Sequence, residues 1–152
     1  MSAFVTAGAG FLLAVLWFDL MFDVQVLGRP RGEAELPESL LASISAYYRR
    51  VTTAARPMNR LVAAVMLGTL AALVVELARD EGPAWAAWAS LGLALAAIGI
   101  AALRTVPGAV RLGALAEGPA VQSRLARSIC RDHLICFGAI AAVLAIQLGF
   151  AT

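Results

Sequence analysis

Four long apolar runs alternate with more polar connections along the chain. The runs cover about residues 4–27, 60–78, 83–104 and 133–151. An α-helix of about 20 apolar residues is long enough to cross a hydrocarbon core of about 30 Å. The pattern therefore predicts an all-α fold, an integral membrane four-helix bundle in which residues 1–152 form a single domain.

The first and third connections contain amphipathic segments. Between Pro37 and Arg56, apolar residues recur at steps of three and four, so they share one side of a helix. These residues are Leu40, Leu41, Ile44, Tyr47, Tyr48, Val51 and Ala55. A narrower stripe of Val121, Leu125 and Ile129 runs straight into the last span. We therefore expect short amphipathic cytoplasmic helices that lie along the membrane interface or pack under the bundle.

The second connection, Arg79 to Pro83, is so short that the second and third spans must form an antiparallel hairpin. Its turn is expected at Gly82-Pro83. Small residues within the spans predict close contacts between helices, because tight packing replaces much of the hydrophobic drive in lipid. These small residues are Ala7-Gly8-Ala9-Gly10, Gly68, Gly92, Gly99, Gly138 and Gly149.

The distribution of charge orients the predicted bundle. All twelve basic residues are arginine: six in the first connection, Arg79 alone in the second, and five in the third. The positive-inside rule then makes the first and third connections cytoplasmic and places both termini outside. Abundant alanine and arginine without lysine is typical of GC-rich bacterial genomes, so the expected location is the inner membrane of a bacterial cell.

Composition narrows the classes of partner. The chain is 61% hydrophobic and has a mean hydropathy of +0.83, values outside the usual range of a soluble domain. Its net charge of +2 is too small to indicate nucleic-acid binding. The arginines beside the apolar runs are instead placed to meet anionic lipid headgroups. The lipid bilayer is therefore the first expected partner, and no nucleic acid is expected.

Ionisable residues at membrane depth are the first candidates for function, because such groups are costly unless they have a partner or face a cavity. Asp19 and Asp23 are four residues apart and therefore lie on one face of the first helix. Their mutual repulsion requires an arginine, such as Arg60 or Arg104, or a shared proton. One interpretation is that these arginines anchor the helix end; the alternatives are a proton relay, a cation site or a substrate-polarising pair.

Two polar residues lie toward the opposite end of the spans. Glu76 is near the outer end of the second helix, where a carboxylate at the interface needs no special role. Gln147 in the fourth span is a weaker candidate for function.

His133 is the only histidine of the chain, with Cys130 and Cys136 three residues away on either side. On a helix the two cysteines differ by about 240° around the axis, so the three side chains cannot meet at one metal ion. We expect no metal site, and we expect both thiols to be reduced. At the cytoplasmic mouth near Asp19 or Asp23, a histidine would suit a general base or a proton carrier. The alternative is a hydrogen-bonded interfacial histidine without a chemical role.

Three short motifs resemble those of a known family. Arg56-Pro57-Met58-Asn59-Arg60-Leu61 precedes the second span, Thr105-Val106-Pro107 follows the third, and Arg131-Asp132-His133-Leu134 begins the fourth. With the order of the elements, they resemble the anthrone oxygenase-like four-helix integral membrane family. The resemblance implies a cofactor-independent oxygenase that oxidises a reduced polycyclic phenol with dioxygen.

The resemblance also implies roles for particular residues. His133, with Asp19 or Asp23, would be the catalytic base that removes a proton from an activated carbon. The residues expected to contact the substrate around an apolar pocket are Tyr48, Asn59, Arg60 and Arg104.

Three functional classes remain open. The chain is either a membrane protein that binds or oxidises an apolar aromatic small molecule, or a non-enzymatic subunit or assembly factor of a membrane complex. The third class is a proton- or ion-coupled transport component, which would need a continuous polar path. Beyond lipid, the expected partners are accordingly an apolar small molecule, a second copy of the chain, or other subunits of a membrane complex. The sequence identifies no cofactor.

Overall fold

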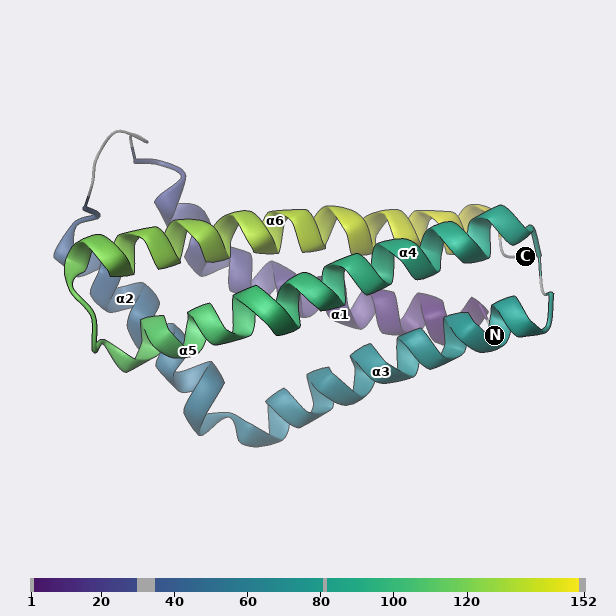
Figure 1. The fold of residues 1–152 in the computed structure, drawn as a ribbon, viewed down its shortest axis with the longest axis horizontal. Helices are drawn as coiled ribbons and strands as arrows, with labels where there is room; N and C mark the ends of the chain where they lie inside the picture. The colour runs from purple at the N-terminus through teal and green to yellow at the C-terminus, as the bar shows by residue number, and fades with distance from the viewer. Residues whose placement is uncertain (1, 30–34, 81, 151–152) are drawn as a thin grey trace.

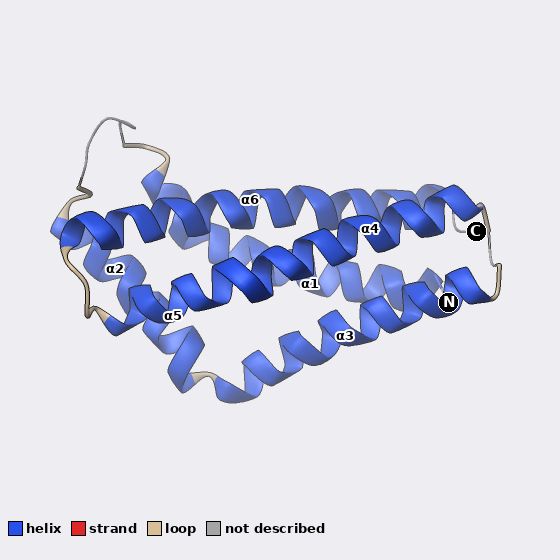
Figure 2. Cartoon of the chain, viewed as in Figure 1, coloured by secondary structure: helices blue, strands red, loops and turns tan. Residues whose placement is uncertain are grey.

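The structure is a computed structural model that describes residues 2–29, 35–80 and 82–150. Every regular element in these ranges is a helix (Figure 2). In chain order the elements are α1 (Ser2–Asp23), the 3₁₀ turn η1 (Val24–Val26), α2 (Glu38–Arg49), the π-helical turn η2 (Arg50–Ala54), α3 (Arg56–Ala78), α4 (Ala84–Ile100), the π-helical turn η3 (Ala101–Thr105), α5 (Val106–Ala114) and α6 (Pro119–Phe150).

Four segments are long and apolar enough to cross a membrane, which confirms the predicted fold class. They are Ser2–Val26, Pro57–Ala78, Ala84–Ala114 and Pro119–Phe150. α6 packs against α1 and α4 along the bundle (Figure 1). The core between the spans consists of small and branched side chains, among which Val5, Ala9, Leu73, Ala94 and Val143 are buried.

The third helix does not end where the apolar run does. It continues through η3 and α5 to Ala114, about ten residues beyond the expected end at 104. Pro107 has no N–H, and its ring crowds the carbonyl four residues earlier, so a regular α-helix cannot pass it unchanged. The π-helical turn that ends two residues before the proline accommodates the ring, and the hydroxyl of Thr105 donates to the carbonyl oxygen of Ile100 at 3.4 Å.

A cap of short helices covers one end of the bundle. α2 lies across α5 and the first turns of α6, where Ile44 packs with Leu112 and Ile129 in a second buried cluster. Gly113 makes this close approach possible, because a Cβ there would lie 2.8 Å from the backbone nitrogen of Arg49. The amphipathic approach to the last span also continues into it, as expected, within the single helix α6.

The contacts predicted for the glycines of the spans are mostly wrong. At Gly8 an added Cβ would collide with the side chain of Thr69, so α1 and α3 do meet closely there. No other atom lies within 4 Å of an added Cβ at the remaining glycines of that prediction, which are Gly10, Gly68, Gly92, Gly99, Gly138 and Gly149. These glycines therefore face open space beside the described helices rather than a neighbouring helix.

The position of α3 creates the space in which the candidate site lies. Near the chain termini α3 contacts α1 and α4, whereas its first half diverges from α4 and α5 (Figure 1). The turn η2 connects this diverging end to the cap. The bundle is thus closed at the end that carries the termini and widened at the arginine-rich end.

Candidate functional site

A buried polar cluster joins α1, α2 and α6 at the arginine-rich end. Asp23 is fully buried, and its Oδ1 accepts a hydrogen bond from the hydroxyl of Tyr48 at 2.7 Å. The other oxygen, Oδ2, lies 2.6 Å from Nδ1 of His133. This pairing places a proton on Nδ1, because the carboxylate oxygen accepts. Asp23 therefore ties the cap helix and the last span to the end of α1.

Asp19 lies one turn earlier on the same face of α1 and is less enclosed. Its Oδ1 accepts a hydrogen bond from the hydroxyl of Tyr47 at 2.6 Å. Its Oδ2 is 3.8 Å from Nε2 of His133, which is an ion-pair distance and too long for a hydrogen bond. The His133 ring thus sits between two carboxylates and bonds directly to one of them.

The two tyrosines act as hydrogen-bond donors to these carboxylates. Burial raises the pKa of Tyr48, and the charge of the adjacent Asp23 raises it further. Burial also raises the pKa of Tyr47, and so does its hydrogen bond to Asp19. Both hydroxyls therefore keep their protons at physiological pH. The ring of Tyr47 is held in place by stacking on Phe22, with the ring centroids 4.0 Å apart.

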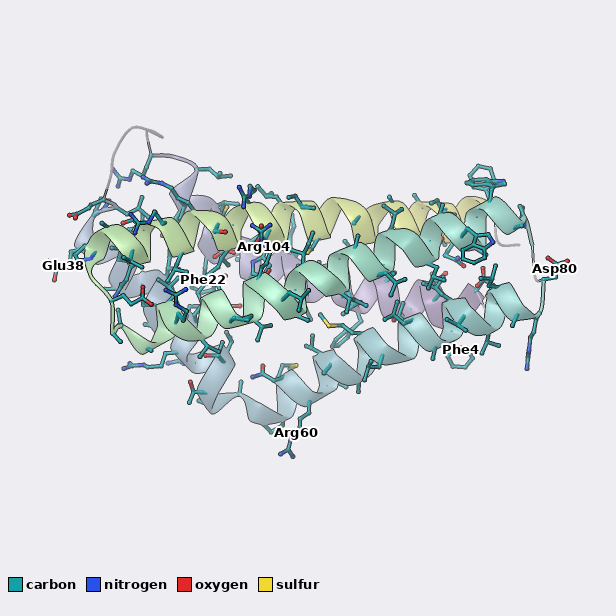
Figure 3. The ribbon with its side chains drawn as sticks, in the orientation of Figure 1. Phe4, Phe22, Glu38, Arg60, Asp80 and Arg104 are labelled. Carbon is teal, nitrogen blue, oxygen red and sulfur yellow. The ribbon has the colours of Figure 1, made fainter. Side chains whose placement is uncertain are left out.

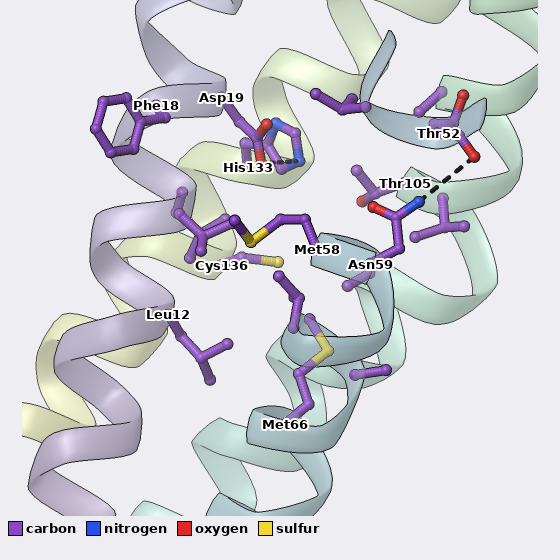
Figure 4. Close-up of a pocket in the computed structure, with 18 of the residues that line it drawn as sticks. Leu12, Phe18, Asp19, Thr52, Met58, Asn59, Met66, Thr105, His133 and Cys136 are labelled. Atoms are coloured by element: carbon purple, nitrogen blue, oxygen red, sulfur yellow. Dashed lines mark hydrogen bonds and ion pairs between the residues drawn. The ribbon is translucent and has the colours of Figure 1, made fainter. Parts of the chain in front are cut away.

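Beside this cluster is an apolar cavity of about 590 Å³ (Figure 4). It lies between the diverging half of α3 and the helices α1, α4, α5 and α6, and its walls include Leu12, Met58 and Met66. Polar side chains gather toward one end, where Asp19 and His133 face the space. A mostly apolar cavity with a few converging polar groups is the usual form of a binding site.

Four of the predicted site residues line this cavity, namely Asp19, Tyr48, Asn59 and His133. Asp23 lies behind them, fully buried against Tyr48 and His133. The side-chain amide of Asn59 donates to the backbone oxygen of Thr52 at 3.4 Å. The catalytic and substrate-binding roles of these residues remain predictions.

The two predicted arginines lie outside the cavity. Arg60 points away from the bundle (Figure 3). The Arg104 guanidinium is 3.2 Å from the carboxylate of Asp132, which also lies 3.6 Å from Arg131. Among the side chains that the structure describes, no ion pair joins Arg60 or Arg104 to Asp19 or Asp23. The expectation that these arginines relieve the acidic pair is therefore wrong, since His133 and the two tyrosines do so.

A second polar group lies near the opposite end of the bundle. The side-chain amide of Gln147 donates to Oε1 of Glu76 at 3.2 Å and to the hydroxyl of Ser90 at 3.4 Å. Glu76 is only 2% exposed, so its carboxylate is enclosed by the helices and bonded to Gln147 rather than open to water. The sequence does indicate this hydrogen-bonded group, because the second, third and fourth spans each place one of its polar residues near the same end.

Comparison with known proteins gives one match. The model of the SHR3 chaperone family, described as ER membrane protein SH3, matches residues 1–151 of the chain. No curated protein and no solved structure matches it significantly.

This match corrects two expectations. The resemblance to the anthrone oxygenase-like family is wrong. Its motifs are short, and a proline near the start of a helix is common in helical proteins of any function. The placement in a bacterial inner membrane is also wrong, because the matched family is described as a protein of the ER membrane. A composition rich in arginine and alanine has no physical connection with a particular membrane.

Proposed function

Because the chain belongs to the SHR3 chaperone family, described as ER membrane protein SH3, we propose that it is a non-enzymatic assembly factor of the ER membrane. Its partners in this proposal are apolar segments of other membrane proteins during their assembly. The chain is itself a small multi-pass membrane protein. Its whole length acts as one domain in the proposal, since α6 contacts α1, α2, α4 and α5.

The observation that carries the proposal is the cavity beside α3. Four of its lining side chains, Phe18, Met58, Val106 and Val110, are also exposed apolar residues on the outside of the bundle. The cavity therefore opens sideways, toward the lipid, where a membrane segment can enter without leaving the bilayer. Helices in lipid associate through close packing, so an open apolar cleft is a surface that an unassembled helix can occupy.

The polar cluster has a structural role in this proposal. Asp23, Tyr48 and His133 fix the cap helix under the mouth of the cavity and keep α1 and α6 in place. The diverging half of α3 can then remain apart from α4 and α5 without collapse of the whole bundle. No chemical step is required of these residues.

Site-specific photocrosslinking tests the proposal. A photoreactive amino acid would replace Met58 in the cavity or Leu67 elsewhere on α3; these side chains are 52% and 67% exposed. A multi-spanning membrane protein would then be translated in vitro into microsomes that contain either variant. We expect crosslinks to the new chain mainly from position 58, and we expect Ala63→Trp, which fills the cavity, to remove them. The matched control Ala64→Trp lies outside the cavity lining and should have no effect.

Equal crosslinking from the two positions would contradict the proposal. So would crosslinking from position 58 that persists in the Ala63→Trp protein.

A further inference from the structure

Beyond the proposed function and independently of it, we infer that the cavity binds a sterol, whose single hydroxyl group bridges His133 and Asp19. These two side chains lie together at the polar end of the cavity (Figure 4). One presents a hydrogen-bond donor and the other an acceptor, and the two atoms are too far apart to bond to each other.

The donor is Nε2 of His133. The other ring nitrogen, Nδ1, lies 2.6 Å from Oδ2 of Asp23, which is behind the cavity wall. As the cation that relieves the acidic pair, His133 has a proton on each ring nitrogen. The proton on Nε2 is directed to the side of Asp19, whose Oδ2 is 3.8 Å away. This distance exceeds the usual N–H···O range of about 2.7 to 3.2 Å, so the donor can still accommodate a partner.

The acceptor is Oδ2 of Asp19. Tyr47 donates to the other oxygen of this carboxylate at 2.6 Å, and the side chain of Asp19 remains 18% exposed. A hydroxyl group can accept one hydrogen bond and donate another. Its oxygen, placed in the gap, can lie about 2.8 to 3.0 Å from both Nε2 and Oδ2. An ammonium group cannot accept, and an ether cannot donate, so neither matches both atoms.

The other hydroxyl groups of the lining already donate to atoms of the protein. Those of Thr52 and Thr105 donate to the backbone oxygens of Tyr48 and Ile100. Those of the two tyrosines donate to the carboxylates of α1. The polar end therefore offers little more than one donor and one acceptor, which suits a small head group and not a phosphorylated one with several charged oxygens.

The charge of the site also favours an uncharged head group. Asp19 and Asp23 together carry more charge than the single imidazolium of His133. The nearby Arg104 is paired with Asp132 and does not reach the cavity. An anionic head group would be repelled there, and the apolar surroundings would strengthen that repulsion.

The shape and depth of the cavity fit a sterol. The apolar lining continues from Asp19 to Leu12, seven residues earlier on α1 and about 10 Å along the helix axis. The volume of about 590 Å³ is typical of a site for one compact small molecule. A sterol has a compact body of fused rings, whereas a diacylglycerol has two long chains. Asp19 lies in the last two turns of α1, near the level at which membrane lipids keep their polar ends.

Competition for a photoactivatable cholesterol tests this inference. The full chain would be reconstituted with this probe in phosphatidylcholine nanodiscs, and unlabelled competitors would be added. We expect crosslinks to the peptides that contain Met58 or Met66, which line the cavity. Cholesterol should compete at least about tenfold better than its 3-O-methyl ether, which can accept a hydrogen bond but cannot donate one to a carboxylate. Dioleoylglycerol should compete no better than the ether.

Three variants of the protein sharpen the test. Ala63→Trp, which fills the cavity, should remove the crosslinks, and Ala64→Trp outside the lining should keep them. Asp19→Ala removes the acceptor, so cholesterol and its methyl ether should then compete equally. The comparison of the two competitors on the unsubstituted protein keeps the test decisive even if Asp19→Ala does not fold.

Three results would overturn the inference. Equal competition by cholesterol and its methyl ether would mean that the gap holds only water and that no lipid hydroxyl is recognised. Stronger competition by dioleoylglycerol would assign the site to an acyl lipid. Crosslinks that survive Ala63→Trp would place the probe outside the cavity. Each of these results leaves the crosslinking of newly made chains from position 58 as a separate measurement, so the proposed function can stand where the sterol site fails.

Discussion

At the scale of single residues, Asp23 shows how this bundle tolerates a carboxylate inside a membrane helix. Both of its oxygens are hydrogen-bonded, one to Tyr48 and the other to His133. A buried charge that loses a partner becomes strongly destabilising, because its desolvation is no longer compensated. Neighbouring Asp19 has a different position, since one of its oxygens faces the cavity. The two aspartates on this face of α1 thus serve different purposes. Asp23 holds three helices together, whereas Asp19 keeps one oxygen facing the cavity.

Phenylalanine substitutions separate these two purposes. Tyr48→Phe removes the donor to fully buried Asp23 and should lower the free energy of unfolding by about 1.5 to 3 kcal/mol, the usual range for a hydrogen bond to a charged group. Tyr47→Phe is the matched control and should cost clearly less, because its partner Asp19 is partly exposed. Thermal unfolding in mild detergent measures both. Equal losses would show that the two carboxylates do not differ in this way.

At the scale of elements, two π-helical turns shape the wall of the cavity. η2 precedes Pro57 by three residues, and η3 ends two residues before Pro107. Pro107 removes a backbone donor from within a continuous helix, and the widened turn η3 before it takes up the misfit. Pro57 lies in the first turn of α3, where a missing N–H costs little. Thr52 in η2 and Thr105 in η3 both face the cavity. The sequence contains the prolines, but it does not show whether a helix ends at such a residue or continues past it.

Glycine contacts between elements could be predicted only in part. The spans are apolar on nearly every side, so their periodicity does not distinguish a face that packs from one that meets lipid. This explains why Gly8 forms the expected contact and Gly99 does not. The cap was easier to predict, because polar residues mark its outer face and Leu40 and Ile44 its inner one.

Two glycine-to-alanine substitutions test this account. At Gly113 a Cβ would lie 2.8 Å from the nitrogen and 3.0 Å from the Cα of Arg49, and these backbone atoms cannot move without shifting α2. We expect Gly113→Ala to lower the free energy of unfolding by about 1 to 3 kcal/mol, as overpacking does. Gly99→Ala is the control: nothing lies within 4 Å of its added Cβ, so it should be neutral or slightly stabilising. The contrast is measured by unfolding in detergent, and equal effects would contradict the close packing of α2 on α5.

At the scale of the whole molecule, the sequence predicted the four spans and the proximity of Asp19 and Asp23 to the start of the last helix. It could not predict which cation relieves the acidic pair. Arg60, Arg104 and His133 all lie near the same end of the predicted spans, and only the rotation of each helix decides which one faces inward. α6 turns His133 inward, whereas Arg104 reaches outward to Asp132. The cavity itself depends on the divergence of α3, for which the chain has no local signal.

The contact between Gly8 and Thr69 is the point from which α3 diverges. The cavity lining begins beyond it, at Phe11 on α1 and Met66 on α3. This contact can therefore be fixed covalently without closing the cavity. A Cβ at position 8 would be 3.3 Å from that of Thr69, just below the range of about 3.5 to 4.5 Å found in disulfides.

In a protein whose Cys130 and Cys136 are replaced by alanine, we expect Gly8→Cys with Thr69→Cys to form a disulfide under mild oxidation. The bond should raise the midpoint of thermal unfolding, because it restricts the unfolded chain. It should leave crosslinking from position 58 unchanged, because the divergent half of α3 remains free. Gly10→Cys with Thr69→Cys is the control and should not form the bond, since no atom lies within 4 Å of an added Cβ at position 10. Loss of crosslinking in the oxidised protein would mean that both ends of α3 must move for a segment to enter. That result would contradict the conclusion that the bundle stays closed at the end that carries the termini.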